Sequence, residues 1–354
     1  MKIRKVFIYI VIIIIVFSLF LWIRNSDLAL ADKKVKRLKV LSQVSPASNN
    51  SIVLCDNGIL IEGEGFNIKA RGIDGKNLWS FQLESTIKDI KVCGSDFLII
   101  TEKNHIFVIS KSGKKLWQYD MPYTPASVIS DGGKYFVIQY NWQEHNTFEI
   151  FSTEGIKSCD GIIDKAHIIS FSTSSDKYFT LSLLDVSLEK VLSKVATYNV
   201  KGEIEWAVNY DSILVPKLKY VSKDSIIIIS EDSAKKYNLK GNLLKEISLA
   251  KTISNIAISK SLLVIITKEN NYYEIYTYDM NLNQLGTSAV SDGIDGIFAA
   301  SDEYILFNED SLTVANKHGR ITELFESSFD INSAYIYDDS VYVISNRKLI
   351  KLTN

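Results

Sequence analysis

The stretch Lys111-Ser112-Gly113-Lys114-Lys115-Leu116-Trp117 has the chemistry of a tight turn that leads into a β-strand. Glycine supplies the positive φ that such a turn requires, and the Leu-Trp pair suits a strand packed on a neighbouring sheet. The same pattern stands 38 residues earlier, at 73–79, and returns in shorter form at 201–206. The stretch is therefore one copy of a repeat.

Weaker copies extend this repeat along the chain. The seven turn positions are 75, 113, 155, 202, 241, 282 and 319, so the gaps between them are 38, 42, 47, 39, 41 and 37 residues. A period of roughly 40 residues is typical of the four-stranded blades of β-propellers.

Each unit has the composition of short strands separated by turns. In one unit the strands are expected at 87–92, 97–101, 105–110 and 116–120, where β-branched and aromatic residues are bounded by Gly, Asn, Asp and Ser. The second strand of the unit occurs eight times, at 59–61, 97–100, 135–138, 178–181, 226–229, 262–266, 304–307 and 341–344. We therefore predict an all-β propeller of four-stranded blades over 36–354, with eight blades favoured and seven as the alternative.

The end of the chain predicts how the ring closes. The last unit ends after its third strand, at 347–352, so it lacks an outer strand. Residues 36–44 have a strand-like alternation and belong to no other unit. We expect them to supply the missing strand, because closure removes the exposed edges that the ring would otherwise have.

The N-terminal segment has the composition of a membrane anchor. Residues 6–23 are eighteen residues without a charge, about 27 Å of helix, which is close to the hydrocarbon thickness of a bilayer. Lys2, Arg4 and Lys5 in the 1–5 tail favour a cytoplasmic N-terminus. We predict a single-pass transmembrane signal-anchor helix, a basic tether at 24–35 and a propeller outside the cytoplasm. A signal peptide cleaved after the A-x-A sequence at 29–31 is the alternative.

Charge is distributed unevenly along the chain. The formal net charge of the 354 residues is −1, yet residues 1–39 contain nine Lys/Arg and two Asp, a net of +7. The remainder therefore carries −8, which argues against nucleic acid as a partner. We expect a monomeric propeller that is attached to the membrane through 6–23.

The glycine turns at 75, 113 and 202 resemble the repeat of pyrroloquinoline-quinone-like β-propellers. With the N-terminal apolar segment, the chain is similar to a group of membrane-anchored bacterial propeller proteins. The resemblance covers about residues 36–354 and implies a fold and a cellular location. It implies no activity, because propellers have many unrelated functions.

Motifs for catalysis or metal binding are missing from the sequence. Quinone-dependent enzymes of the resembling family use two adjacent cysteines, whereas Cys55, Cys93 and Cys159 are far apart. The four histidines show no metal-ligand spacing, and no P-loop, G-x-S-x-G or H-E-x-x-H occurs. We therefore expect no cofactor, no metal and no enzymatic activity, and we interpret the cysteines as small packing residues without a disulfide.

One loop is a candidate for binding. Residues 140–147 join the second and third strands of the third unit, where the other units use two to four residues. This loop holds Trp142 and His145, and strand order places Tyr123 and Tyr210 on the same face of the ring. Exposed Trp and Tyr are common at recognition surfaces. These four residues are the predicted binding contacts, and the alternative for Trp142 is packing against its own blade.

Two functions remain open at this point. The favoured one is a non-enzymatic, membrane-tethered propeller that binds a protein or a cell-envelope polymer outside the cytoplasm. The alternative is an enzyme or small-ligand receptor with its site in the central channel. A deep channel pocket with convergent carboxylates or histidines would favour the alternative.

Overall fold

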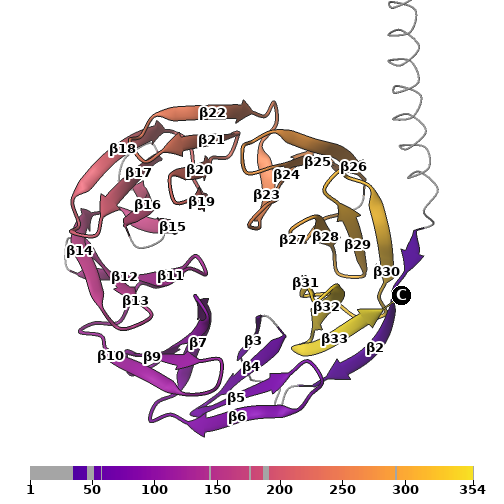
Figure 1. Ribbon diagram of the computed structural model, residues 1–354, viewed down its shortest axis with the longest axis horizontal. Helices are drawn as coiled ribbons and strands as arrows, with labels where there is room; N and C mark the ends of the chain where they lie inside the picture. The colour runs from indigo at the N-terminus through magenta and orange to yellow at the C-terminus, as the bar shows by residue number, and fades with distance from the viewer. Residues whose placement is uncertain are drawn as a thin grey trace, which may run out of the picture.

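The computed structural model describes residues 35–45, 52–56, 58–142, 145–174, 177–185, 191–291 and 293–353. Within these ranges the chain forms 33 strands in eight sheets, which stand as blades around a central axis (Figure 1). The prediction of an all-β propeller with eight four-stranded blades is confirmed. The predicted transmembrane helix at 6–23 lies outside the described residues.

The first four blades follow one another along the chain, each running from the inner strand to the outer strand. Blade 1 is β3 (Ile52–Asp56), β4 (Ile59–Glu64), β5 (Asn67–Gly72) and β6 (Asn77–Gln82). Blade 2 is β7 (Ile87–Cys93), β8 (Asp96–Thr101), β9 (His105–Ser110) and β10 (Lys115–Asp120). Blade 3 is β11 (Ser127–Ser130), β12 (Tyr135–Trp142), β13 (His145–Ser152) and β14 (Lys157–Asp164). Blade 4 is β15 (His167–Ser174), β16 (Tyr178–Asp185), β17 (Leu192–Asn199) and β18 (Ile204–Asp211).

The other four blades complete the ring. Blade 5 is β19 (Lys217–Ser222), β20 (Ser225–Ile229), β21 (Ser233–Asn238) and β22 (Leu243–Ser248). Blade 6 is β23 (Ile253–Ile258), β24 (Leu263–Glu269), β25 (Tyr272–Tyr278) and β26 (Gln284–Val290). Blade 7 is β27 (Gly296–Ala299), β28 (Glu303–Phe307), β29 (Ser311–Asn316) and β30 (Ile321–Glu326). Blade 8 is β31 (Ser333–Tyr337), β32 (Ser340–Ser345), β33 (Lys348–Thr353) and the N-terminal β2 (Lys39–Val44).

Burial along the strands explains their sequences. The second strand of a blade is packed on both faces by neighbouring blades, so β20 is Ser followed by four isoleucines and is buried throughout. The outer strand β10 instead alternates between exposed and half-buried residues after its first two positions. The core is thus divided among the interfaces between blades.

The turn before each outer strand has the predicted backbone. All seven predicted turn positions have positive φ, from 59° at Leu282 to 84° at Gly113. A side chain at Gly113 is also sterically excluded, because a Cβ there would collide with the indole of Trp79 in the preceding blade. Glycine at this position therefore serves both the turn and the contact between blades.

A polar side chain three residues before the turn glycine also shapes the turn, a feature that the sequence analysis missed. In blade 5, Asn238 Oδ1 accepts hydrogen bonds from the backbone N–H of Lys240 at 2.9 Å and of Asn242 at 3.0 Å. Equivalent bonds are accepted by Ser110, Ser152, Asn199, Asp279 and Asn316. Such side chains mimic a backbone turn.

The residue four positions after the positive-φ turn residue packs on the corresponding turn of the next blade. Trp79 lies on Gly113, and its Nε1 donates to the carbonyl oxygen of Lys111 at 2.8 Å. The equivalent contacts are Trp117 on Gly155, Cys159 on Gly202, Trp206 on Gly241 and Lys245 with Asn283. The tryptophans lie between blades as expected, although half-buried rather than fully buried, and Cys159 takes the tryptophan position in blade 3.

Ring closure follows the prediction with one correction. β2 pairs antiparallel with β33 and completes blade 8, as expected (Figure 1). The preceding strand β1 (Lys36–Arg37) instead pairs parallel with β30 of blade 7, so residues 36–44 are not one strand of the last blade. The path changes blade at Leu38, because its side chain is 7% exposed and packs in the core shared by blades 7 and 8.

In the described part of the chain, no helix is both long enough and apolar enough to cross a bilayer.

Candidate functional site

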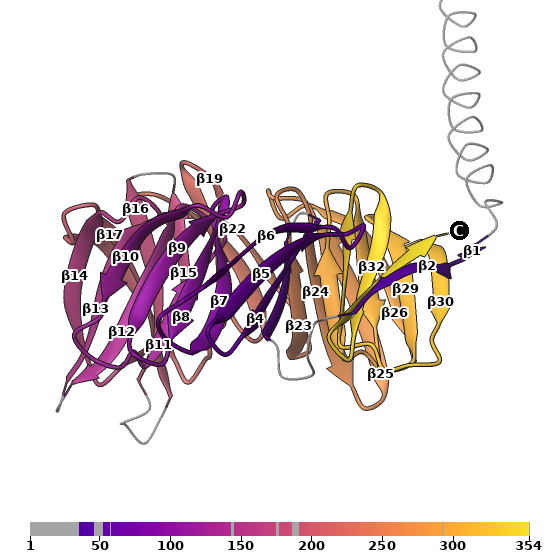
Figure 2. The ribbon, with the colours of Figure 1, turned by 90° about the horizontal axis from the view of Figure 1, so that it is seen from below.

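Blades 3 and 4 have the longest strands in the ring. All seven strands from β12 to β18 have eight residues, whereas the other described strands have two to seven. Strands β12, β13 and β14 lie at the left of the ring in Figure 2. Strand length therefore distinguishes blades 3 and 4 from the rest of the described ring.

An open groove lies on the outer wall between these two blades. Its volume is about 570 Å³, and it is lined from β13 and β14 of blade 3 and from β16, β17 and β18 of blade 4. Ile163, Leu183 and Tyr198 are its buried apolar part, each less than 9% exposed. Asp164 ends β14 and Ile204 begins β18, so the groove runs along the height of the wall. We call it the blade 3–4 groove.

Polar and charged side chains lie at one end of the blade 3–4 groove. His145 Nδ1 lies 3.1 Å from Asp164 Oδ1, and both side chains are more than half exposed. Asp164 has φ of 51°, and the turn after it is held by Asn146, whose Nδ2 donates to the carbonyl oxygen of Ala166 at 2.8 Å. Asp185 and Lys194 add charges of both signs. Opposite charges at an apolar groove orient a bound chain.

Two isoleucines at the groove are exposed, and Ile162 is the most exposed large apolar side chain of the described residues. Ile162 is 70% exposed and Ile204 is 55% exposed. Adjacent residues of a strand point to opposite faces, so the Ile162-Ile163 pair on an outer strand has to expose one member. That pair is the sequence signal that could have identified this surface.

The four predicted binding residues do not form one site. His145 lines the groove. Tyr123 is 45% exposed and contacts the buried Tyr140 edge-on, with ring centroids 6.2 Å apart, and it does not line the groove. The predicted loop at 140–147 is instead part of two strands, because residues 140–142 extend β12 and 145–147 extend β13, with the backbone of Trp142 paired to His145. The side chain of Trp142 lies outside the described part of the structure.

The fourth residue, Tyr210, requires a correction. It is 6% exposed, with its hydroxyl 3.5 Å from that of Tyr237, so it belongs to the core between blades 4 and 5 rather than to the surface. Burial raises the pKa of its hydroxyl well above the ordinary range. The expectation of exposure failed because strand order gives the face of a loop and not the direction of a side chain.

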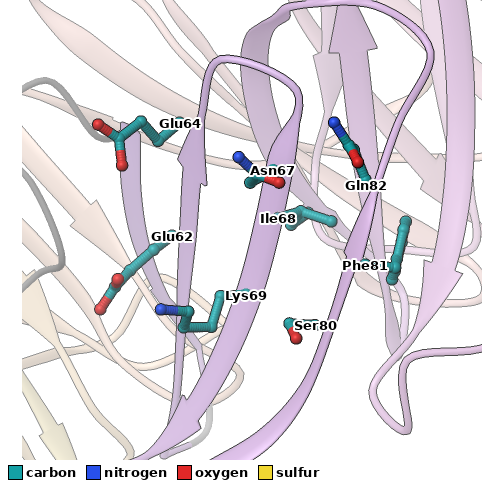
Figure 3. Close-up of a pocket in the computed structure, with 8 residues that line it drawn as sticks. All are labelled: Glu62, Glu64, Asn67, Ile68, Lys69, Ser80, Phe81 and Gln82. Atoms are coloured by element: carbon teal, nitrogen blue, oxygen red, sulfur yellow. The ribbon is translucent and has the colours of Figure 1, made fainter.

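A second cavity, of about 430 Å³, lies on blade 1 and is polar (Figure 3). Glu62, Glu64 and Lys69 extend from neighbouring strands to the same side of the blade. Glu62 is 3% exposed and pairs with Arg71 at 3.4 Å, and Arg71 also donates to the carbonyl oxygen of Ser45, just after β2. These contacts join blade 1 to the closing strand, so this cavity borders a structural ion pair.

The described residues provide little basis for metal binding or for thiol chemistry. No three His, Cys, Asp or Glu side chains gather there in a way that could hold a metal ion. All three cysteines are free. Burial raises the pKa of Cys55 to about 11 and the pKa values of Cys93 and Cys159 to about 12.

These pKa values predict unreactive thiols, since the thiolate is the nucleophile. At pH 8 we expect the native protein to incorporate no maleimide label during an hour, and three labels per chain after denaturation. Mass spectrometry of intact protein measures both numbers. Rapid labelling of one cysteine in the native state would contradict the burial of that thiol.

The fold and the groove define a β-propeller with an asymmetric outer wall. The chain belongs to the family described as "Family of unknown function (DUF5711)", whose model matches residues 32–352. No curated protein matches the chain in sequence.

Solved structures similar to the chain are propellers of very different sequence. BamB from Moraxella catarrhalis matches with a TM-score of 0.57 and 9% identity, over 90% of this chain and 100% of that one. Saccharomyces cerevisiae Sqt1 matches with a TM-score of 0.57 and 10% identity, over 89% and 98%. The WD40 domain of Neurospora crassa Pan2 matches with a TM-score of 0.50 and 9% identity, over 90% and 96%. At these identities the similarity supports the fold alone.

Proposed function

We propose that this chain is a non-enzymatic, membrane-tethered propeller that binds a protein partner outside the cytoplasm through the blade 3–4 groove. The observation that carries the proposal is the exposure of Ile162 and Ile204 along that groove. Large aliphatic side chains exposed beside a buried apolar floor are typical of surfaces that a partner covers. We also assign the repeat to the pyrroloquinoline-quinone-like class, on the evidence of its glycine turns.

The composition of the groove favours a protein over an envelope polymer. Its exposed apolar residues are aliphatic, and they suit apolar side chains of a partner. Polar groups at the end near His145 and at Lys194 would orient such a partner. We infer the membrane tether from the charge-free run at 6–23, and that run and the basic tail before it support a location outside the cytoplasm.

The test is site-specific crosslinking in living cells. A photo-crosslinking amino acid in place of Ile162 should give a discrete protein adduct, and the additional change Ile204→Asp should reduce its yield at least about ten-fold, since a carboxylate buried against an apolar partner is strongly unfavourable. Leu244 on blade 5 is the matched control, because it is also 55% exposed and does not line the groove. Leu244→Asp should leave the adduct unchanged.

Two results would count against the proposal. Equal losses of the adduct at 162 from Ile204→Asp and from Leu244→Asp would show that the groove is not selective. An adduct at 162 that survives Ile204→Asp would place the contact elsewhere on blade 3. Each surface variant should unfold within about 0.5 kcal/mol of the unmodified chain, so that a loss of binding is not a loss of folding.

A further inference from the structure

The outer wall of blades 7 and 8 carries a basic and apolar patch where the described chain begins. Lys36, Arg37 and Lys39 are exposed there, beside Val40 at 47% and Leu41 at 58%. We call these five residues the entry patch. Of the seven residues from 33 to 39, five are basic and none is acidic.

The outer strand of blade 8 differs from those of blades 1 and 2. The first five residues of β2 are all exposed, whereas β6 and β10 alternate after their first two positions. The pairing of β2 with β33 shifts register between Val40 and Ser42. This shift interrupts the alternation of side chains, so Val40 and Leu41 are both exposed. Two neighbouring apolar residues beside basic ones suit a partner that has a charged surface layer and an apolar interior beneath it.

The direction of β1 shows from which face the described chain enters the ring. β1 is parallel to β30, with Lys36 beside Glu323 and Arg37 beside Leu324, and β30 runs away from the turn at Gly319. The first residue of β1 therefore lies toward the face that carries this turn, and the described chain begins on that side. The twelve residues from 24 to 35 span at most about 40 Å, so they keep the entry patch near whatever holds residues 6–23.

We propose that the entry patch rests on the surface of an anionic lipid bilayer, with the basic side chains at the phosphates and with Val40 and Leu41 at the level of the headgroups. This inference rests on the membrane anchoring proposed above. Charge complementarity supports it, because basic residues near an anionic surface each strengthen binding about five-fold. Glu323 lies 4.0 Å from Lys36 and offsets part of its charge, so Arg37 and Lys39 supply most of the attraction to the lipid.

The contact would determine how the propeller presents its groove. Blades 7 and 8 lie across the ring from blades 3 and 4 (Figure 1). A ring that stands on its entry patch would hold the blade 3–4 groove at the greatest distance from the membrane. Partners outside the cell would then reach the groove without obstruction by the bilayer.

The experiment uses the full chain reconstituted in vesicles, with the photo-crosslinker p-benzoylphenylalanine in place of Leu41 or, as control, in place of Ile162. Vesicles contain phosphatidylcholine with or without about one third phosphatidylglycerol. We expect lipid adducts at position 41 at least about ten times more often than at 162 in the anionic vesicles. The triple change Lys36→Ser, Arg37→Ser and Lys39→Ser should reduce the adducts at 41 about ten-fold or more.

The outcomes separate this inference from the proposed anchoring. Equal lipid adducts at 41 and 162, or adducts at 41 that do not depend on phosphatidylglycerol or on the basic residues, would overturn the entry patch as an anionic-lipid contact. Resistance of the chain to extraction by alkaline carbonate would leave the anchoring intact in that case. Complete extraction by carbonate would overturn the anchoring, and the entry patch with it.

Discussion

Replacing Arg71 with methionine is expected to lower the free energy of unfolding by about 3–5 kcal/mol, the range measured when one partner of a buried ion pair is removed. Glu62 is 3% exposed, and its carboxylate would lose the guanidinium that now lies 3.4 Å away. The variant also loses the hydrogen bond to the carbonyl oxygen of Ser45, which links blade 1 to the end of the closing strand. We therefore expect the ring to open at the junction of blades 8 and 1 first.

Chemical denaturation of the solubilised full chain measures this effect, and hydrogen exchange locates it. The control is the double variant Glu62→Gln with Arg71→Met, which removes the buried charge and should recover much of the lost stability. If Arg71→Met alone unfolds like the unmodified chain, the ion pair does not hold the junction. Faster exchange in blade 4 than in β2, β3 and β4 would also contradict the assignment.

The second large effect is expected for Trp117→Ala, at about 3 kcal/mol, the lower end for truncation of an aromatic core residue because Trp117 is only half-buried. Its indole stacks on Phe136 and Phe151 of blade 3, with ring centroids 6.1 and 6.2 Å away. It also lies against Gly155, so the variant opens a cavity between blades 2 and 3.

Leu116 provides the neighbouring control. It is 42% exposed on the same strand, and Leu116→Ala should change stability by no more than about 0.5 kcal/mol. Equilibrium denaturation of both variants decides the matter. If Trp117→Ala and Leu116→Ala had equal effects, the tryptophan would not be the contact that joins the two blades.

The candidate site was predictable only in part. The extra residues at 140–147 identified blade 3 and His145, because an insertion in a regular repeat is visible in the sequence, but they lengthen β12 and β13 instead of forming the predicted long loop. Ile162 and Ile204 escaped notice, since each stands in an ordinary strand of its own unit. They come together at one groove only when blade 4 packs beside blade 3.

Sequence alone favoured eight blades over seven, placed the turns and located the closing strand within residues 36–44. The turns and the blade count depend on local chemistry that the units repeat, namely a positive φ at one position and apolar runs of strand length. The closing strand is visible because the last unit departs from that repeat and lacks its own outer strand. The tertiary structure decided the burial of Tyr210, the passage of the chain at Leu38 from blade 7 to blade 8, and the Glu62–Arg71 pair at the ring junction. These depend on which side chains of two different blades face each other, and that is set by the packing of one blade on the next rather than by the repeat within either.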